Sequence, residues 1–190
     1  MELVLMRHAK TSGNLVKRYI GSRTDEPLAP EGIAQAEAIT ERGITRVYVS
    51  PMRRAVETAT IRFPNAERVL IEDFREMDFG DFEGQSAAEM SENAAYRAWV
   101  DANCEPAPPG ASETWAEYSD RVCSAIVRLT REAAARGEER VVTLSHGGVI
   151  MAAMTRWARP EKAYYMWNPS HCSGYIAQIG ADWNGNSVFP

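Results

Sequence analysis

The sequence predicts an α/β fold with a mostly parallel central sheet and a small helical cap. Short apolar strands alternate with helical segments up to residue 71, which is typical of a parallel sheet with crossover helices. Two apolar strands end in a histidine, at His8 and His146. An acidic and aromatic segment then interrupts the alternation between residues 73 and 110.

The first strand, Leu3–Met6, consists of four apolar residues and suits a short buried strand. Arg7 and His8 follow it directly, before a polar turn that contains Gly13 and Asn14. Ligands bind at the carboxyl ends of strands in open α/β sheets, so these residues are candidates for a site. A single Arg-His pair is weak by itself, because any strand can end this way as it leaves the core.

The following segments continue the alternation of strands and helices. Pro30 is a typical first residue of a helix, and Gly43 is a plausible stop after it. Pro51 opens a second helix in the same way. The expected ranges are a loop over 17–30, a helix over 30–42, a strand over 46–50, a helix over 51–63 and a strand over 69–71.

The segment of about residues 77–112 is expected to form a cap over the strand ends, within a single domain of residues 1–190. A helix is expected over residues 86–100, with Met90 and Trp99 facing inward, and a stiff proline-rich linker closes the segment at Gly110. The alternative is a surface excursion without a role.

A long helix follows the cap. Thr114 and Glu117 have the spacing of a capping box, although Ser112 could also be the cap. A strand over 140–145 then delivers His146 to the edge that carries Arg7, and a helix over 149–157 and a strand over 174–179 follow. One helix face carries an apolar stripe that we assign to the core: Trp115, Tyr118, Val122, Ile126, Leu129 and Ala133.

Composition excludes several classes of protein. Apolar residues make up 45% and charged residues 25% of the 190 residues, as in ordinary globular domains. The net charge of −5 argues against binding nucleic acid or an anionic membrane. Three widely spaced cysteines make neither a disulfide framework nor a zinc pattern. The N-terminus lacks the pattern of a signal peptide, so we expect a cytoplasmic protein.

The residues at the strand ends are expected to form an anion-binding site. Arg7 and His8, Arg53 just inside the helix after Ser50, and His146 are expected at one edge of the sheet. Arginine presents a planar fork that matches phosphate oxygens, and histidine serves as nucleophile or base near neutral pH. Backbone N–H groups of the glycines after His146 add further donors, so phosphate is the expected anion.

The motifs around these residues make the chain similar to the histidine phosphatase superfamily, the phosphoglycerate mutase-like proteins. Four motifs occur in the family's order and span nearly the whole chain. They are Arg7-His8-Ala9 with Thr11 and Asn14 downstream, the Ser-x-x-x-Arg-Ala-x-x-Thr-Ala pattern at 50–59, Glu76 before Phe79-Gly80-Asp81-Phe82-Glu83-Gly84, and Ser145-His146-Gly147-Gly148.

The resemblance implies a three-layer α/β/α sandwich and a set of catalytic roles. His8 would attack phosphorus and carry a phosphohistidine. The phosphoryl oxygens would be held by Arg7, Arg53, His146, Asn14 and the backbone of Gly147. Glu76 would protonate the leaving oxygen and then activate water. No metal or other cofactor is implied, since side chains supply the positive charge.

Some nearby residues receive a structural interpretation. Ala9 replaces the family's usual glycine, and we expect an ordinary φ there. Asp78, Asp81 and Glu83 are read as solvated loop charges. His171 is read as a residue of a loop or of the pocket rim. The tryptophans Trp99, Trp115 and Trp167 are assigned to packing.

The resemblance leaves three functions open: a phosphatase, a cofactor-dependent phosphoglycerate mutase, and a non-catalytic module that binds a phosphorylated ligand. The modest cap favours hydrolysis, because the family's mutases usually carry longer insertions. Resemblance of the cap to α-ribazole phosphatases suggests α-ribazole 5′-phosphate, and hence cobalamin biosynthesis; broad-specificity sugar-phosphate phosphatases are also similar. The expected partner is a small phosphorylated metabolite, with a homodimer as a further expectation.

Overall fold

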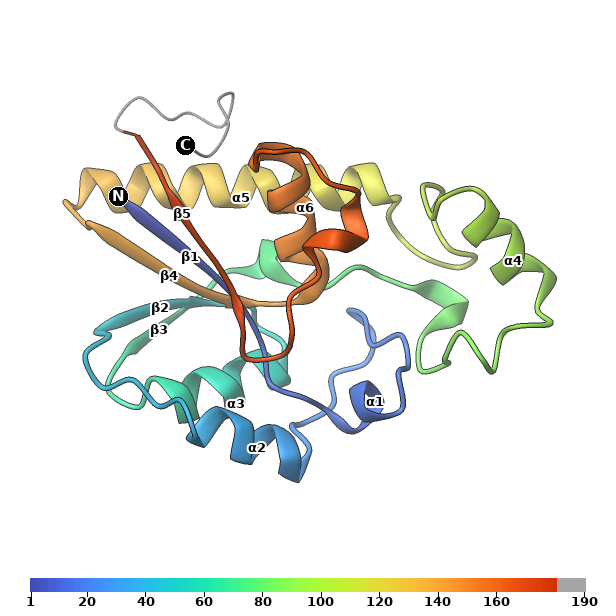
Figure 1. Ribbon diagram of the computed structural model, residues 1–190, viewed down its shortest axis with the longest axis horizontal. Helices are drawn as coiled ribbons and strands as arrows, with labels where there is room; N and C mark the ends of the chain where they lie inside the picture. Colours follow the sequence, from blue (N-terminus) through green and yellow to red (C-terminus); the bar gives the residue numbers. More distant parts are fainter. Residues whose placement is uncertain (181–190) are drawn as a thin grey trace.

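A computed structural model describes residues 1–180 as a five-stranded sheet with helices on both faces (Figure 1). The strand order is β3-β2-β4-β1-β5. The first four of these strands pair in parallel, and β5 pairs antiparallel with β1. The strands are β1 (Glu2–Arg7), β2 (Arg46–Val49), β3 (Glu67–Leu70), β4 (Arg140–Ser145) and β5 (Gly174–Gln178).

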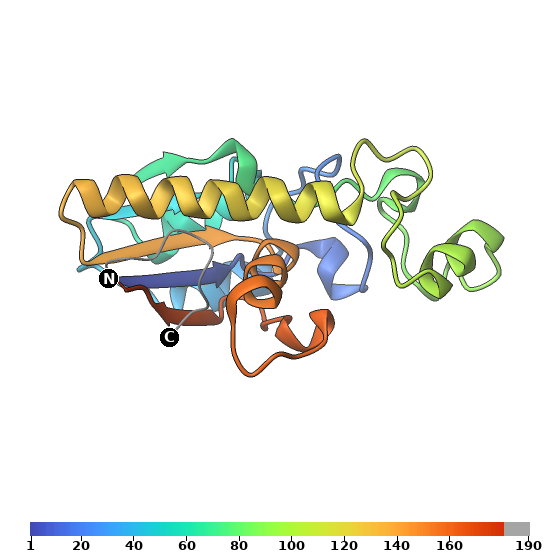
Figure 2. The same cartoon turned by 90° about the horizontal axis from the view of Figure 1, so that it is seen from above.

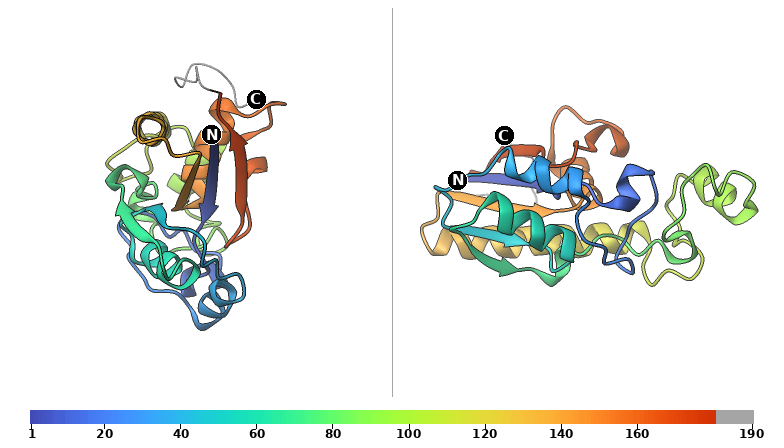
Figure 3. Two further views of the ribbon diagram at one scale, coloured as in Figure 1. Left: turned by 90° about the vertical axis from the view of Figure 1, so that its left-hand side faces the viewer. Right: turned by 90° about the horizontal axis from the view of Figure 1, so that it is seen from below.

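Helices cover the two faces of the sheet in the predicted three layers (Figure 3). Helix α3 packs on one face with α2 beside it, and α5 and α6 pack on the other. No helix of residues 1–180 is long and apolar enough to cross a membrane. The helices are α1 (Ser12–Leu15), α2 (Pro30–Glu37), α3 (Arg53–Arg62), α4 (Ala94–Asp101), α5 (Trp115–Ala135) and α6 (Gly147–Trp157), and the 3₁₀ turns are η1 (Glu72–Phe74), η2 (Gly80–Phe82) and η3 (Tyr164–Trp167).

Strand β1 lies between β4 and β5 and is buried on both faces. Its side chains alternate: Leu3 and Leu5 belong to the core under α5 and α6, whereas Val4 and Met6 belong to the core under α3. Four apolar residues in a row are therefore needed, as in other parallel sheets covered on both sides.

Three helices are shorter than predicted, and of these α3 differs least, beginning at Arg53 rather than at Pro51. Helix α2 ends at Glu37, because the chain turns toward the end of α3, where the Glu41 N–H donates to the Arg62 carbonyl at 2.7 Å. Helix α4 begins only at Ala94, since the Asn93 side chain caps the N–H groups of residues 95 and 96. The Thr114–Glu117 capping box of α5 is confirmed.

The segment 77–112 lies beyond the carboxyl ends of the strands, past the start of α5 (Figure 2). It has its own small core, in which Phe82, Met90, Tyr96 and Trp99 are buried together. Trp99 also donates from Nε1 to the Pro106 carbonyl at 2.9 Å, which ties α4 to the proline-rich linker.

Candidate active site

A pocket of about 310 Å³ lies at the carboxyl ends of β1 and β4, between the sheet and the segment 77–112. Five of the residues predicted for the site line it: Arg7, His8, Asn14, Glu76 and Gly147. They come from the end of β1 and the residue after it, from α1, from the loop after η1 and from the start of α6. The described part of the chain contains no group of three or more His, Cys, Asp or Glu side chains placed to hold a metal ion.

His8 is held in one tautomer. Its Nδ1 lies 2.6 Å from the carbonyl oxygen of Ala9, and because a carbonyl only accepts, Nδ1 carries the proton. The lone pair is then on Nε2. Burial, together with the charges of Arg54 and Arg7, lowers the pKa of His8 well below its ordinary value. His8 is thus a neutral imidazole with a free Nε2, the form needed for a nucleophile. Ala9 does not have a positive φ, as expected.

Arg7 turns its guanidinium toward the same pocket. Nη1 donates to Asn168 Oδ1 at 3.0 Å and to the Pro169 carbonyl at 2.9 Å. Its Nε is buried and has no hydrogen-bond partner among the described residues. A buried unpaired donor is costly, and a phosphoryl oxygen would satisfy it.

Arg53 does not line the pocket, contrary to expectation, and Arg54 is the arginine of this helix that lies against His146, behind the lining residues. Arg53 lies on the outer face of α3, its side chain 57% exposed and paired with Glu57 at 2.7 Å. Arg54 is fully buried and points inward, where its charge contributes to the lowered pKa of His8. Counting the Ser-x-x-x-Arg-Ala pattern from Ser50 leads to Arg54, so the sequence contained the signal.

His146 lies beside His8, with ring centroids 5.1 Å apart, but both its nitrogens are engaged. Nε2 donates to Ser50 Oγ at 2.7 Å, and Nδ1 accepts from Arg54 Nε at 3.3 Å. Burial and the charge of Arg54 lower the pKa of His146 well below its ordinary value. His146 is neutral and does not line the pocket. It orients Arg54 instead of donating a hydrogen bond into the pocket.

Asn14 is oriented by two hydrogen bonds. Its Oδ1 accepts from the Thr11 N–H at 3.1 Å and lies 3.1 Å from His171 Nε2. His171 also lies close to His8, with ring centroids 5.5 Å apart, and burial lowers its pKa to about 3. With Oδ1 used as an acceptor, the Asn14 amide nitrogen is the group left to donate into the pocket.

Glu76 is buried at the pocket wall and held by three donors. Tyr118 Oη and the Met77 N–H donate to Oε1 at 2.6 and 3.0 Å, and the Gly148 N–H donates to Oε2 at 3.1 Å. There is no room for a side chain at Gly148, where a Cβ would overlap Glu76 Oε1 and lie 2.7 Å from Tyr118 Oη. The apolar spacing of the long helix predicted Tyr118 only as a core residue. This spacing gives no sign of the hydrogen bond from the Tyr118 hydroxyl to Glu76.

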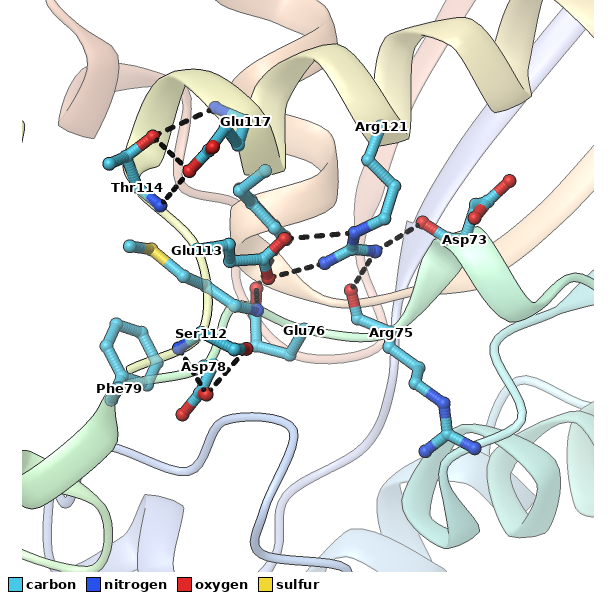
Figure 4. Close-up of polar contacts among 12 residues, drawn as sticks. Asp73, Arg75, Glu76, Asp78, Phe79, Ser112, Glu113, Thr114, Glu117 and Arg121 are labelled. Atoms are coloured by element: carbon cyan, nitrogen blue, oxygen red, sulfur yellow. Dashed lines mark hydrogen bonds and ion pairs between the residues drawn. The ribbon is translucent and has the colours of Figure 1, made fainter. Parts of the chain in front are cut away.

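Two of the three loop carboxylates, one buried and one half-buried, accept several hydrogen bonds, contrary to expectation. Asp78 is 4% exposed and accepts from Arg23, from the Gly80 N–H and from both the N–H and hydroxyl of Ser112 (Figure 4). Glu83 accepts from the Gly21 N–H and the Thr24 hydroxyl. Both carboxylates join the segment 77–112 to the loop after α1, while Asp81 is exposed as predicted.

Aromatic side chains form much of the remaining pocket wall. Trp115 and Tyr164 contribute on one side, with ring centroids 5.4 Å apart. Tyr19, Phe79 and Trp99 also line the pocket, and Tyr19 is in edge contact with the other two rings. Trp167 is buried outside this pocket, in agreement with the packing role expected for it. Trp99 and Trp115 line the pocket, so packing is not their whole role.

Comparison with known proteins places this geometry in a family. A family model described as the histidine phosphatase superfamily (branch 1) matches residues 3–184. "Phosphoglycerate mutase-like protein 4" of Arabidopsis thaliana is 34% identical over 84% of this chain and 72% of its own length. The "Metal-independent phosphoserine phosphatase" of the same plant is 29% identical over 89% and 74%. The α-ribazole phosphatase structure from Shigella flexneri has the same fold, with a TM-score of 0.81, 24% identity and coverage of 99% and 98%.

Proposed function

Because this chain belongs to the histidine phosphatase superfamily and is an enzyme of the phosphatase type, we propose that it hydrolyses a small phosphomonoester through a phosphohistidine on His8, without a metal ion. The observation that carries the proposal is the hydrogen bond from His8 Nδ1 to the Ala9 carbonyl, which leaves Nε2 free in a pocket that is also lined by Arg7, whose Nε is unpaired.

The first chemical step would transfer the phosphoryl group to His8. Nε2 attacks phosphorus while the bond from phosphorus to the leaving oxygen breaks, and Glu76 gives its proton to that oxygen. The guanidinium groups of Arg7 and Arg54 offset the negative charge that moves through the transition state. The Asn14 amide and the free N–H of Gly147 at the start of α6 would hold phosphoryl oxygens.

The second step would return the enzyme to its starting state. Glu76, now a carboxylate, takes a proton from water as the water oxygen bonds to phosphorus. The bond between phosphorus and His8 Nε2 then breaks, which releases inorganic phosphate and regenerates the protonated Glu76.

As the specific substrate we propose α-ribazole 5′-phosphate, whose base is a planar aromatic ring. This substrate would make the enzyme part of cobalamin synthesis. The aromatic wall supports this choice, since Trp115, Tyr164 and Tyr19 offer ring faces or edges to such a group. Base–aromatic stacking contributes about 1–3 kcal/mol per base. Phosphoserine, suggested by a relative's name, would instead place its carboxylate near Lys17 or Arg18 of the pocket mouth.

The test is phosphate release from a panel of substrates, with and without EDTA. The panel contains α-ribazole 5′-phosphate, phosphoserine, 3-phosphoglycerate, sugar phosphates and p-nitrophenyl phosphate. We expect hydrolysis that EDTA does not reduce and the highest kcat/KM for α-ribazole 5′-phosphate. A preference for phosphoserine would show that α-ribazole 5′-phosphate is the wrong substrate, but the proposed reaction through His8 would stand. Conversion of 3- to 2-phosphoglycerate with a bisphosphate primer and no phosphate release would make the enzyme a mutase, and binding without turnover would make it a ligand-binding module.

A further inference from the structure

Tyr118 is a buried phenol near the start of α5, in contact with Glu76, which lines the pocket. Its side chain is fully buried, and its hydroxyl lies 2.6 Å from Glu76 Oε1. Burial and the negative charge of Glu76 raise the pKa of Tyr118 well above its ordinary value, so the phenol keeps its proton. A protonated phenol next to a carboxylate oxygen donates, and the direction of this hydrogen bond is therefore fixed.

The two carboxyl oxygens of Glu76 differ in the number of lone pairs that accept no hydrogen bond. Each carboxylate oxygen has two lone pairs that accept hydrogen bonds. Oε1 accepts from Tyr118 and from the Met77 N–H, so both of its positions are occupied. Oε2 accepts only the Gly148 N–H among the described residues. One lone pair on Oε2 is left to carry a proton.

We propose that Tyr118 is a positioning residue that occupies Oε1 and thereby makes Oε2 the oxygen through which Glu76 transfers protons. In the first step, the proton on Oε2 moves to the leaving oxygen as its bond to phosphorus breaks. In the second step, Oε2 takes a proton from water as the water oxygen bonds to phosphorus and the bond to His8 breaks. This inference rests on the proposed function, since it assigns an atom to the role that Glu76 has there.

The surroundings of Tyr118 hold this arrangement in place. Arg121, one turn further along α5, lies over the Tyr118 ring, with its guanidinium carbon 5.0 Å from the ring centroid. The same guanidinium donates to the carbonyl oxygens of Asp73 and Arg75 at 2.8 and 3.3 Å and pairs with Glu113 (Figure 4). Helix α5 therefore holds both the phenol and the backbone directly before Glu76, which fixes the position of one relative to the other.

The test is Tyr118→Phe, which removes the hydroxyl and keeps the ring. We measure kcat/KM from pH 5 to 9 for glycerol 3-phosphate, whose alkoxide needs a proton to leave, and for p-nitrophenyl phosphate, whose leaving group does not. For glycerol 3-phosphate we expect a loss of about tenfold, because the carboxyl is no longer fixed. The pH profile for this substrate should also change, since the group that transfers the proton has lost a hydrogen bond. For p-nitrophenyl phosphate we expect a change of less than about threefold.

Tyr48→Phe is the matched control. Tyr48 is also buried and also donates to a carboxylate, at 2.9 Å from Glu138, but it lies in β2 away from the pocket. We expect it to lower the melting temperature without changing the pH profile or the ratio between the two substrates. Tyr118→Met fills similar space without a donor and serves as a second variant if Tyr118→Phe is insoluble.

The outcomes separate this inference from the proposed function. If the wild-type enzyme hydrolyses both substrates through His8 while the donor-less Tyr118 variants keep its pH profile and substrate ratio, Tyr118 is only a packing residue and the inference is wrong, although the phosphatase assignment stands. If the wild-type enzyme releases no phosphate from either substrate, the proposed function and this assignment are overturned together.

Discussion

Arg54 carries a positive charge that water does not reach. Its donors bind His146 and the backbone carbonyl oxygens of the loop after α1, including those of Gly21 and Thr24. No carboxylate of the described residues lies within ion-pair distance of it. Carboxylates act on this charge only from a distance, among them Glu76, Asp25, Glu83 and Glu26. A buried charge without a directly paired carboxylate is costly, and a bound phosphoryl group would add negative charge near it.

Removing this charge should therefore affect catalysis far more than removing its neighbour. We expect Arg54→Ala to lower kcat/KM for p-nitrophenyl phosphate by about 10²- to 10³-fold, as for loss of one electrostatic contact to a transition state. Arg53→Ala removes only a surface pair with Glu57, and its activity should stay within about twofold of wild type. The reverse order of losses would restore Arg53 to the site.

His8 provides a second prediction, on pH. Because its pKa is well below the ordinary value, His8 stays neutral as the pH falls from 7.5 to 6. After correction for ionisation of the substrate, kcat/KM for p-nitrophenyl phosphate should be flat over this interval. A decline centred near pH 6.5 would show an ordinary, exposed histidine instead. His8→Ala should abolish turnover while the circular dichroism spectrum is unchanged.

At the scale of elements, Asp78 links three separate segments: the loop of Arg23, the turn at Gly80 and the chain before α5 at Ser112. Burial would raise the pKa of Asp78, but these hydrogen bonds outweigh it and lower the pKa overall. We expect Asp78→Asn to reduce the free energy of unfolding in urea by about 1–3 kcal/mol at pH 7. It should also raise KM, since these links position the pocket's outer wall.

The lowered pKa of Asp78 determines how its contribution to stability changes with pH. The stabilisation by Asp78 is present above the unfolded-state pKa, near 3.9, and is lost as the pH falls through the lower folded-state value. The difference between wild type and Asp78→Asn should therefore shrink below about pH 4. Asp81→Asn, in the same turn but exposed, is the control and should change the free energy of unfolding by less than about 0.5 kcal/mol.

Prediction from the sequence succeeded where the cause is local. The strand over 140–145 and the Thr114–Glu117 capping box depend on neighbouring residues, and both are confirmed. The end of α2 depends on a contact between Glu41 and Arg62, 21 residues apart, which no local pattern contains. Tyr118 has the spacing of a core residue and is one. Its second contact, to a carboxylate 42 residues earlier, exists only after the chain has folded.

At the scale of the whole molecule, the three histidines of the sequence gather at one place and share one property. His8 lies within 5.5 Å, between ring centroids, of both His146 and His171. Burial lowers the pKa of all three. Unfolding below about pH 6.5 therefore exposes three imidazoles that take up protons, which favours the unfolded state.

We accordingly expect the free energy of unfolding to fall as the pH drops from 6.5 to 5, with a slope approaching about 4 kcal/mol per pH unit for three protons. Urea titrations at half-unit pH steps measure this slope. His171→Asn should reduce it by about one third. A stability that is constant over this interval would contradict the burial of neutral histidines.

The position of β1 between β4 and β5 has a consequence for synthesis of the chain. Strand β1 leaves the ribosome well before its two partners, which begin at Arg140 and Gly174. At about 5–20 residues per second, Glu2 waits roughly 7 to 28 seconds for Arg140, its partner in register. During that time the apolar run Leu3–Met6 has no neighbouring strand and is open to chaperones or to pairing with other nascent chains. His8, directly after this strand, thus gains the neighbouring rings of His146 and His171 only after residue 171 has been synthesised.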